Sequence, residues 1–384
     1  MKQIAYPAAL GSCVLGGGAT PLWAAEWSIS PIYSAAVDYD SNRRLQVEGG
    51  KGTDATVLAI DVKFKRALED IEFTIEPRYA FRRYTDASLG NGDDRTLNAE
   101  MTWARERSVL SLTASYWDQS TLTTELLETG LVSGDTHRRN SQAGANWSWN
   151  QTELRSLQVQ LNYVDVSYYG QAAELFPGYR YSSGSLGERF AFSERGSFTV
   201  STYGSIFSSS IADNNSHQLG LQAEGIYAFS ERSNVDVSVG ESKRVIGGAS
   251  SSGTDISASV NHSFFRDKVS LAYTRSLVPY GSGFLVERQQ STATLIHPWN
   301  EYLDANLTFL RVQNNETAVL LRIDRRSYTS LSAGLDWRPT ETLSVDARVD
   351  AVHSVLADLT GDTANSWRST VTVSWHPLPK SRSW

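Results

Sequence analysis

The sequence has very little cysteine and no long apolar run, and both shortages narrow the fold. Its only cysteine among 384 residues is Cys13. That residue lies in an N-terminal segment that we expect to be removed, so the mature chain would have no disulfide and no cysteine-based metal site. A helical membrane protein needs runs of about 20 apolar residues, and none follows residue 26. A polytopic helical membrane protein is therefore excluded.

Positive charge is also scarce. The chain has 35 Lys and Arg against 42 Asp and Glu, which gives a formal net charge of −7. Because nucleic-acid binding depends on basic surfaces, this balance argues against a nucleic-acid partner. Aromatic residues are plentiful by contrast, with 11 Trp, 17 Tyr and 13 Phe. That content argues against a disordered chain.

The first residues have the layout of a secretory signal. Lys2 supplies a positive start, residues 4–18 carry no charge, and Ala24 and Ala25 precede Glu26. This order predicts a cleaved signal peptide over residues 1–25. No composition shift marks a linker in the remaining chain, so we expect residues 26–384 to form one domain.

The mature chain alternates apolar and polar residues over most of its length. Clear examples are residues 71–76, 97–103, 157–163, 256–261, 303–309 and 343–349. Side chains of a strand alternate between two faces, so each segment would have one apolar and one polar face. The sequence therefore predicts an all-β protein.

The connections between these segments alternate between short and long. The short ones lie near residues 66–70, 105–108, 150–154, 192–197, 229–234, 265–268, 298–302 and 338–342. The longer ones are rich in Gly, Ser, Asn and Asp and lie near residues 41–52, 85–95, 119–139, 208–216, 247–253 and 357–366. Outer-membrane barrels have short periplasmic turns and longer outer loops, and an even number of strands. We predict a single antiparallel transmembrane β-barrel of about 18 strands with both termini in the periplasm.

Aromatic residues near the strand ends support a barrel over a sandwich or a propeller. They are Trp27, Tyr79, Phe81, Trp103, Tyr116, Trp147, Trp149, Tyr163, Trp337, Trp367 and Trp375. Such residues form girdles where a barrel meets the membrane interfaces. We therefore expect the protein in the outer membrane of a Gram-negative bacterium, with membrane lipid and lipopolysaccharide as partners.

Charged residues on the polar strand faces are the candidate pore lining. They are Glu72, Glu76, Arg78, Arg82, Glu100, Asp346, Arg348 and Asp350. Mixed charge on the polar face is what barrels normally carry. We interpret these residues as a wall that solvates a pore or fills it with salt bridges.

The longest connection, residues 119–139, is a candidate constriction. It contains Glu125, Leu126, Leu127 and Glu128, which is more apolar than an outer loop requires. We expect this segment either to fold into the mouth of the barrel or to form a short helical cap.

The sequence offers no enzyme motif. None of its six histidines pairs with another at metal-ligand spacing, and it contains no nucleophile elbow, phosphate-binding loop or dinucleotide fingerprint. Asp350 and His353 are near in sequence, but their spacing places them on opposite faces of a strand. We predict no catalytic residue, no metal and no cofactor.

Four short stretches of the mature chain form a recognisable series. They are residues 27–31 followed by 39–42, residues 120–125 with Gly130, residues 162–168 and residues 279–283. Together they resemble a group of outer-membrane barrel proteins linked to exopolysaccharide synthesis and to exosortase (PEP-CTERM) systems. Ser41 separates Asp40 from Asn42, whereas the family's opening motif has the Asp and Asn adjacent. The resemblance implies a role in exopolysaccharide export or assembly, with polysaccharide and other export-system proteins as partners, and no defined catalytic residue.

The favoured expectation is thus a channel or guide for extracellular polysaccharide. Three alternatives stay open at this point. They are a general diffusion porin, a barrel-embedded enzyme that modifies glycan or lipid, and a surface scaffold with a blocked lumen.

Overall fold

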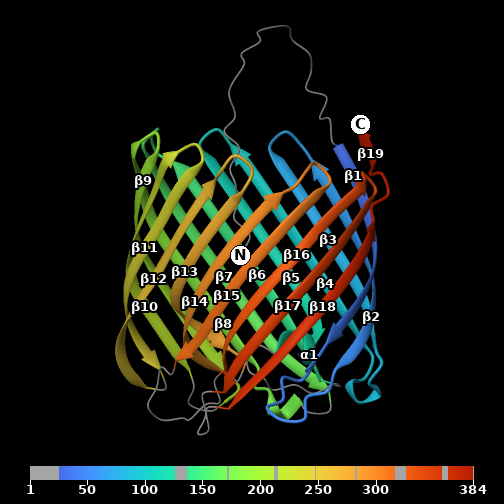
Figure 1. Cartoon of the computed structure of the whole chain (residues 1–384). Coiled ribbons are helices and arrows are strands. Elements are labelled where there is room, and N and C mark those ends of the chain that lie inside the picture. The colour runs from blue at the N-terminus through green and yellow to red at the C-terminus, as the bar shows by residue number, and fades with distance from the viewer. Residues whose placement is uncertain are drawn as a thin grey trace.

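The computed structural model describes residues 26–125, 136–170, 173–211, 215–246, 248–281, 283–315, 326–356 and 362–383. The predicted signal peptide and the residues Leu126, Leu127 and Glu128 lie outside this part of the chain. All strands belong to one antiparallel sheet, which closes on itself because β1 pairs with both β2 and β18 (Figure 1). The prediction of a closed barrel with eighteen long strands is confirmed.

The strands follow one another around the wall in chain order. They are β1 (Glu26–Asp40), β2 (Thr53–Ala67), β3 (Ile71–Tyr84), β4 (Gly92–Arg105), β5 (Ser108–Ser120), β6 (Thr136–Asn150), β7 (Arg155–Gly170), β8 (Tyr179–Ser193), β9 (Gly196–Ser209), β10 (Ser216–Ser230), β11 (Ser233–Ile246), β12 (Ala249–Ser263), β13 (Lys268–Tyr280), β14 (Phe284–Pro298), β15 (Leu303–Asn315), β16 (Arg326–Thr340), β17 (Leu343–Leu356) and β18 (Thr363–Trp375). A short β19 (Lys380–Ser383) pairs with the first residues of β1.

In the described part of the chain, helical structure is limited to three single turns, η1 (Ala87–Leu89), α1 (Thr121–Thr124) and η2 (Ala173–Leu175). Among the described residues, no helix is long and apolar enough to cross a membrane.

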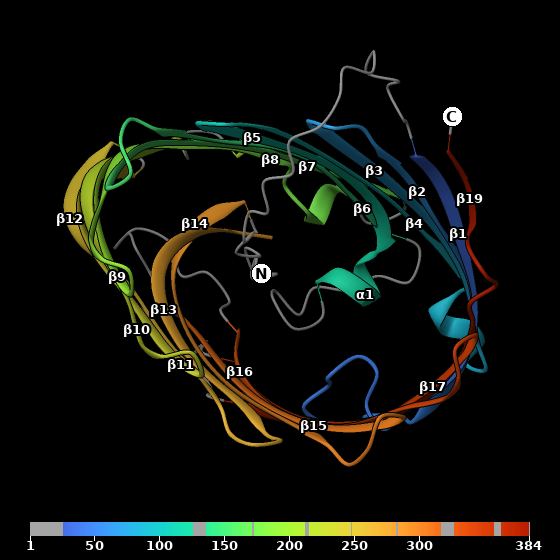
Figure 2. The same ribbon diagram turned by 90° about the horizontal axis from the view of Figure 1, so that it is seen from above.

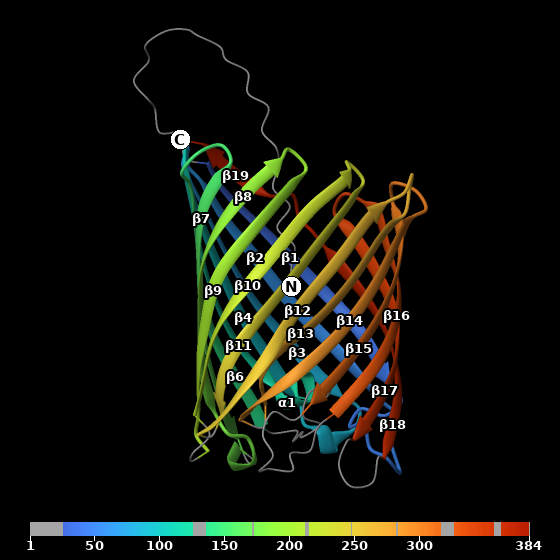
Figure 3. The ribbon, with the colours of Figure 1, turned by 90° about the vertical axis from the view of Figure 1, so that its left-hand side faces the viewer.

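The two ends of the barrel differ in their connections, as the sequence predicts. The short connections, β19 and the start of β1 lie at one end, which we call the turn end (Figures 1 and 3). The longer connections and α1 lie at the other end, which we call the loop end. Outer-membrane barrels keep their short turns in the periplasm, so we expect the turn end to face the periplasm.

One predicted connection is wrong. Residues 247–253 were expected to form a long loop, but β12 begins at Ala249 and pairs with β11 as far as Ile246. The segment is rich in Ser and Gly, which are common in turns. A β-hairpin that continues beyond the lipid layer is as polar as a loop. Composition alone therefore does not distinguish a long loop from paired strands here.

The two faces of the wall differ sharply in polarity. On β2, Leu58 and Ile60 have 55% and 39% of their surface exposed, while Ala59 between them is buried and Asp61 follows on the same face as Ala59. The same alternation continues around the sheet. Within hydrocarbon every backbone group must be paired inside the protein, and a closed barrel satisfies this condition.

The wall departs from a simple cylinder between β12 and β13. These strands pair only from Ser263 and Lys268 up to Ile256 and Arg275, whereas β13 and β14 continue to pair up to Tyr280. Beyond this point the β13–β14 hairpin bends into the lumen and lies inside the ring formed by the other strands (Figure 2).

The split begins where the outward-facing positions change from apolar to polar. On β12 the outward residue changes from Ile256 to Thr254, and on β13 it changes from Tyr273 to Arg275. Unpaired backbone costs several kcal/mol per group in hydrocarbon. The split lies beyond the apolar band, toward the loop end. The free-energy cost of unpairing β12 from β13 is therefore much lower here than within the apolar band.

Candidate functional site

The part of the β13–β14 hairpin that enters the lumen, residues 276–287, is here called the inner hairpin. Its tip turns between Tyr280 and Phe284, where the Gly283 N–H donates to the Tyr280 carbonyl at 2.9 Å. Gly283 has φ +77°, and a Cβ at this position would lie 2.6 Å from Pro177 Cγ and 2.8 Å from Ser209 Oγ. Both the backbone angle and the close approach to the β7–β8 connection require glycine.

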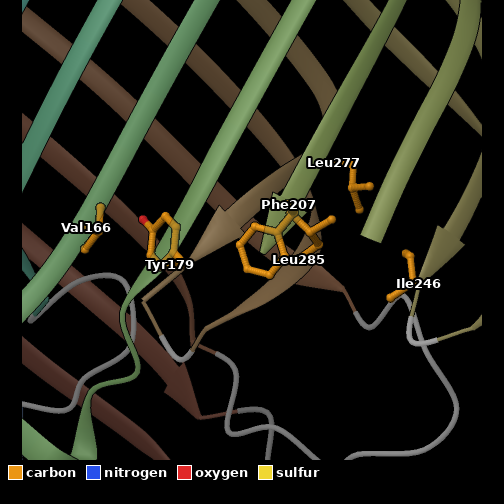
Figure 4. Packing of buried hydrophobic residues seen from close by; sticks show 6 residues of the cluster. All are labelled: Val166, Tyr179, Phe207, Ile246, Leu277 and Leu285. Carbon is orange, nitrogen blue, oxygen red and sulfur yellow. The ribbon is translucent and has the colours of Figure 1, made fainter. Parts of the chain in front are cut away.

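An apolar cluster holds the inner hairpin against the inner surface of β7, β8, β9 and β11 (Figure 4). Leu277 and Leu285 come from the hairpin, and the wall supplies Val166, Tyr179, Phe207 and Ile246. The members have 1–6% of their surface exposed. Burying one leucine side chain is worth about 1.5–3 kcal/mol relative to exposing it. The cluster therefore stabilises the hairpin inside the lumen.

A buried ion network lies beside this cluster. Arg244 on β11 is 4% exposed, and its Nη2 donates to Asp255 Oδ1 at 2.7 Å. Arg275 donates to Glu287 Oε2 at 3.0 Å, and Arg244 Nη1 lies 3.9 Å from the same carboxylate. Gln218 Nε2 also donates to Asp255, at 2.9 Å. Charges that leave water need such partners, so the network fixes how the hairpin sits on the wall.

A second element, α1, follows β5 in the chain and lies inside the ring of strands (Figure 2). The Ser120 side chain caps it by accepting from the Leu122 N–H at 3.3 Å. Leu122 is 2% exposed and packs with Ala55, Tyr84 and Leu89. These contacts place the helix on the inner surface of β2 and β3.

Of the predicted constriction residues, the structure describes Glu125 alone, and it lies in the lumen directly after α1. Its side chain is fully buried, accepts from the Tyr168 hydroxyl at 2.9 Å and pairs with Arg138 at 3.2 Å. The structure therefore ties this end of the β5–β6 connection to β6 and β7. Whether the rest of the connection narrows the mouth stays a prediction.

The predicted pore-lining residues all occupy the inner face of the wall, but in two separate groups. Glu72, Glu76, Arg78, Arg82 and Glu100 lie on β3 and β4, and Asp346, Arg348 and Asp350 lie on β17. Strands β18, β1 and β2 separate the two groups. Each group borders a hollow in the inner surface, of about 510 Å³ beside β3 and β4 and about 460 Å³ beside β17.

Five of these eight residues form ion pairs, three of them with a neighbouring strand and two along β17. Lys63 lies 2.8 Å from Glu76, and Lys65 lies 2.9 Å from Glu72. On β17, Arg348 Nε donates to Asp350 at 2.7 Å. The arrangement fits the interpretation of a mixed-charge wall, and its role in conduction stays a prediction.

Sequence reasoning missed a further ion cluster near the loop end of β1. Arg43 is 3% exposed and lies 3.3 Å from Asp38 and 3.6 Å from Asp40. Arg368 on β18 reaches Asp40 at 3.2 Å. The cluster joins the first and last long strands, so it stabilises closure of the barrel. The adjacent Asp and Arg residues were visible in the sequence, but the partner on β18 was not.

The inner hairpin was also missed, although the sequence carries a signal for it. Residues 277–280 and 284–286 are apolar at consecutive positions, so alternation fails on both arms of the hairpin. Tyr179, Phe207 and Ile246 are apolar at inner-face positions of the wall. A lumen-facing apolar patch opposite an apolar hairpin predicts contact between the two.

Comparison with known proteins supports the fold and corrects the function. No family model matches the chain, and no curated protein matches it. Among solved structures, Pseudomonas aeruginosa OccK7 (OpdD) is similar with TM-score 0.51 and 12% identity, covering 94% of this chain and 100% of that one. Acinetobacter baumannii OccAB3 is similar with TM-score 0.50 and 11% identity, covering 91% of this chain and 99% of that one.

These neighbours are outer-membrane porins, and this protein is a large barrel of the Gram-negative outer membrane. Its surroundings are therefore membrane lipid and lipopolysaccharide. The expected export of exopolysaccharide is wrong, because the barrels that the fold matches are porins and nothing matched links the chain to exopolysaccharide or exosortase systems. The resemblance that suggested it depended on short stretches such as residues 279–283, of which Pro279 and Tyr280 end β13 in the inner hairpin.

Proposed function

We propose that this protein is a diffusion channel that admits small hydrophilic solutes across the outer membrane. The observation that carries the proposal is the inner hairpin, which narrows the lumen of a closed barrel whose inner face is polar and charged. Barrels of 16–18 strands can leave an aqueous channel. A hairpin fixed inside such a lumen limits the size of the solutes that pass.

The hydrated inner face supports the same proposal. Serine, threonine, asparagine and charged side chains line β1 to β4 and β15 to β18, and they border both hollows described above. Passage along such a wall needs no bond to be made or broken. The proposal therefore includes no catalytic step and no export-system partner.

Planar-bilayer recording of the purified protein tests the proposal. We expect stable, stepwise conductance and swelling of proteoliposomes in small sugars and amino acids, with a cut-off that falls steeply as solute size rises. A folded barrel that gives neither conductance nor swelling would contradict it. Turnover of a glycan or lipid that Glu76→Gln abolishes would favour the embedded enzyme instead.

A further inference from the structure

The inner face carries carboxylates that have no cationic partner, and they lie near the turn end. They are Glu100 on β4, Glu224 on β10, Asp236 on β11, Asp336 on β16 and Asp346 on β17. Each lies within six residues of the turn end of its strand. None of them forms an ion pair with any residue in the described ranges. These strands are spread around the circumference, so the carboxylates act on the whole passage and not at one binding site.

The cations of the same half do not neutralise these carboxylates. Lys63 and Lys65 are already paired with Glu76 and Glu72. Arg338 and Arg348 of the same half pair with Asp304 and Asp350. Arg189 on β8 and Lys268 on β13 are the two inner-face strand cations of that half that form no ion pair with a described residue, and the five carboxylates outnumber them. The turn-end half of the lumen therefore carries an excess of negative charge.

Most of the described arginines of the loop-end half are, by contrast, paired with acids. Arg138 lies 3.2 Å from Glu125, Arg244 lies 2.7 Å from Asp255, Arg275 lies 3.0 Å from Glu287 and Arg368 lies 3.2 Å from Asp40. Arg82 donates to the hydroxyls of Thr123 and Tyr84 at 3.2 and 3.4 Å. Counting the described residues, this half is close to neutral, so they do not cancel the charge at the turn end.

Three aspartates stand in one row at the turn end. Asp304 is directly opposite Asp336 on the next strand, and Asp336 is directly opposite Asp346. Asn306 donates to Asp336 at 2.9 Å, and Arg338 lies 3.4 Å from Asp304. Like charges directly opposite each other destabilise a sheet. Mobile cations in the lumen would offset this repulsion.

We infer that the channel favours small cationic solutes over anionic solutes of equal size, and that the five unpaired carboxylates set this preference. The inference rests on the proposed function, because charge selectivity requires a conducting lumen. A passage lined by one sign of charge, with walls of low dielectric, concentrates ions of the opposite sign. Salt screens the effect, with a Debye length of about 10 Å at 0.1 M and 30 Å at 0.01 M. The preference should therefore be largest in dilute salt.

Reversal potentials in a KCl gradient across a planar bilayer test the inference. The wild-type protein should give a potential of the sign that K⁺ permeation produces. The variant with Glu100→Gln, Glu224→Gln, Asp236→Asn, Asp336→Asn and Asp346→Asn should lose about half or more of that potential while still conducting, because it removes the charge that concentrates K⁺. The pair Asp336→Asn with Asp346→Asn should show an intermediate loss and serves as the milder variant if the full set folds poorly.

A control matched to the double variant removes two carboxylates from the outer face of the wall. Asp93 and Asp165 pair with Arg95 and Arg180 on the lipid side of the wall, so Asp93→Asn with Asp165→Asn should leave the reversal potential unchanged. A conducting wild-type channel with a zero or anion-signed potential would overturn the inference and leave the diffusion channel standing. Absence of conductance would overturn the channel itself.

Discussion

Leu271 and Leu277 lie on the same face of the same strand and meet opposite surroundings. Leu271 has 49% of its surface exposed on the lipid side of the wall, whereas Leu277 has 6% exposed and packs in the cluster with Phe207 and Ile246. On β14, Leu295 is 38% exposed and Leu285 is 4% exposed. Alternation decides which face of a strand a residue occupies. The path of the strand then decides whether that face meets lipid or the protein interior.

Removing the inner hairpin should have the largest effect. Residues 277–287 can be replaced by Asn-Gly, because Ser276 and Arg288 are directly paired and a two-residue turn can join them. We expect single-channel conductance to rise by roughly twofold or more, since the lumen of a barrel of this size is wide when no element fills it.

The control for this deletion is a test that the barrel wall still folds. The variant should keep the heat-dependent gel mobility of a folded barrel, because the wall pairing of β12 with β13 ends at Arg275 and is not touched. Unchanged conductance in a folded variant would show that the hairpin does not limit the passage.

Substitution of the buried Arg244 should have the next largest effect. Arg244→Ala leaves Asp255 and Glu287 without their shared cation, and breaking a buried ion pair costs about 3–5 kcal/mol. We expect protease cleavage within residues 276–287 and a noisier current. As the control, Arg155→Ala removes a half-exposed arginine that pairs with Glu188 on the outer face, and such pairs contribute about 1 kcal/mol or less. Equal effects of the two variants would contradict the buried network.

Replacing Leu271 or Leu277 with arginine should distinguish the lipid-facing position from the buried one directly. Leu271→Arg places a charge against lipid and should lower the free energy of unfolding by about 2–4 kcal/mol if the site is near the bilayer midplane. Leu277→Arg should leave the stability of the wall nearly unchanged and raise conductance, because the hairpin can no longer stay in the cluster. Urea unfolding in lipid vesicles and bilayer recording measure the two effects. A reversed pattern would mean that Leu277 faces lipid.

The sequence was sufficient to predict the barrel wall, because the residues of each strand carry their own alternating pattern. Alternation at residues 71–76 or 343–349 is local, and the short turns between strands are local as well. Closure also follows from local facts, since an open edge cannot be tolerated in lipid. The inner-face position of Glu72, Glu76 and Asp346 needed nothing more than the period of two.

The lumen could not be predicted in the same way, because its contents depend on contacts between distant segments. Leu277 meets Phe207 and Ile246, and Arg368 meets Asp40, only after the barrel has closed. The broken alternation at residues 277–280 sets Leu277 apart from Leu271, but it does not say which distant residues Leu277 meets. The constriction was therefore sought in the longest connection, residues 119–139, while a hairpin with a much shorter connection enters the lumen.

Cross-linking of the hairpin in its two possible positions tests the central claim most directly. The mature chain contains no cysteine if residues 1–25 are removed, so introduced pairs can be read without interference. Ile246→Cys with Leu277→Cys joins members of one packed cluster, and we predict that a short bifunctional thiol reagent links them in the folded barrel. If the hairpin instead continued in the wall, the register of β12 and β13 would bring Ser252 opposite Pro279. Efficient linking of Ser252→Cys to Pro279→Cys, with none between positions 246 and 277, would contradict the account.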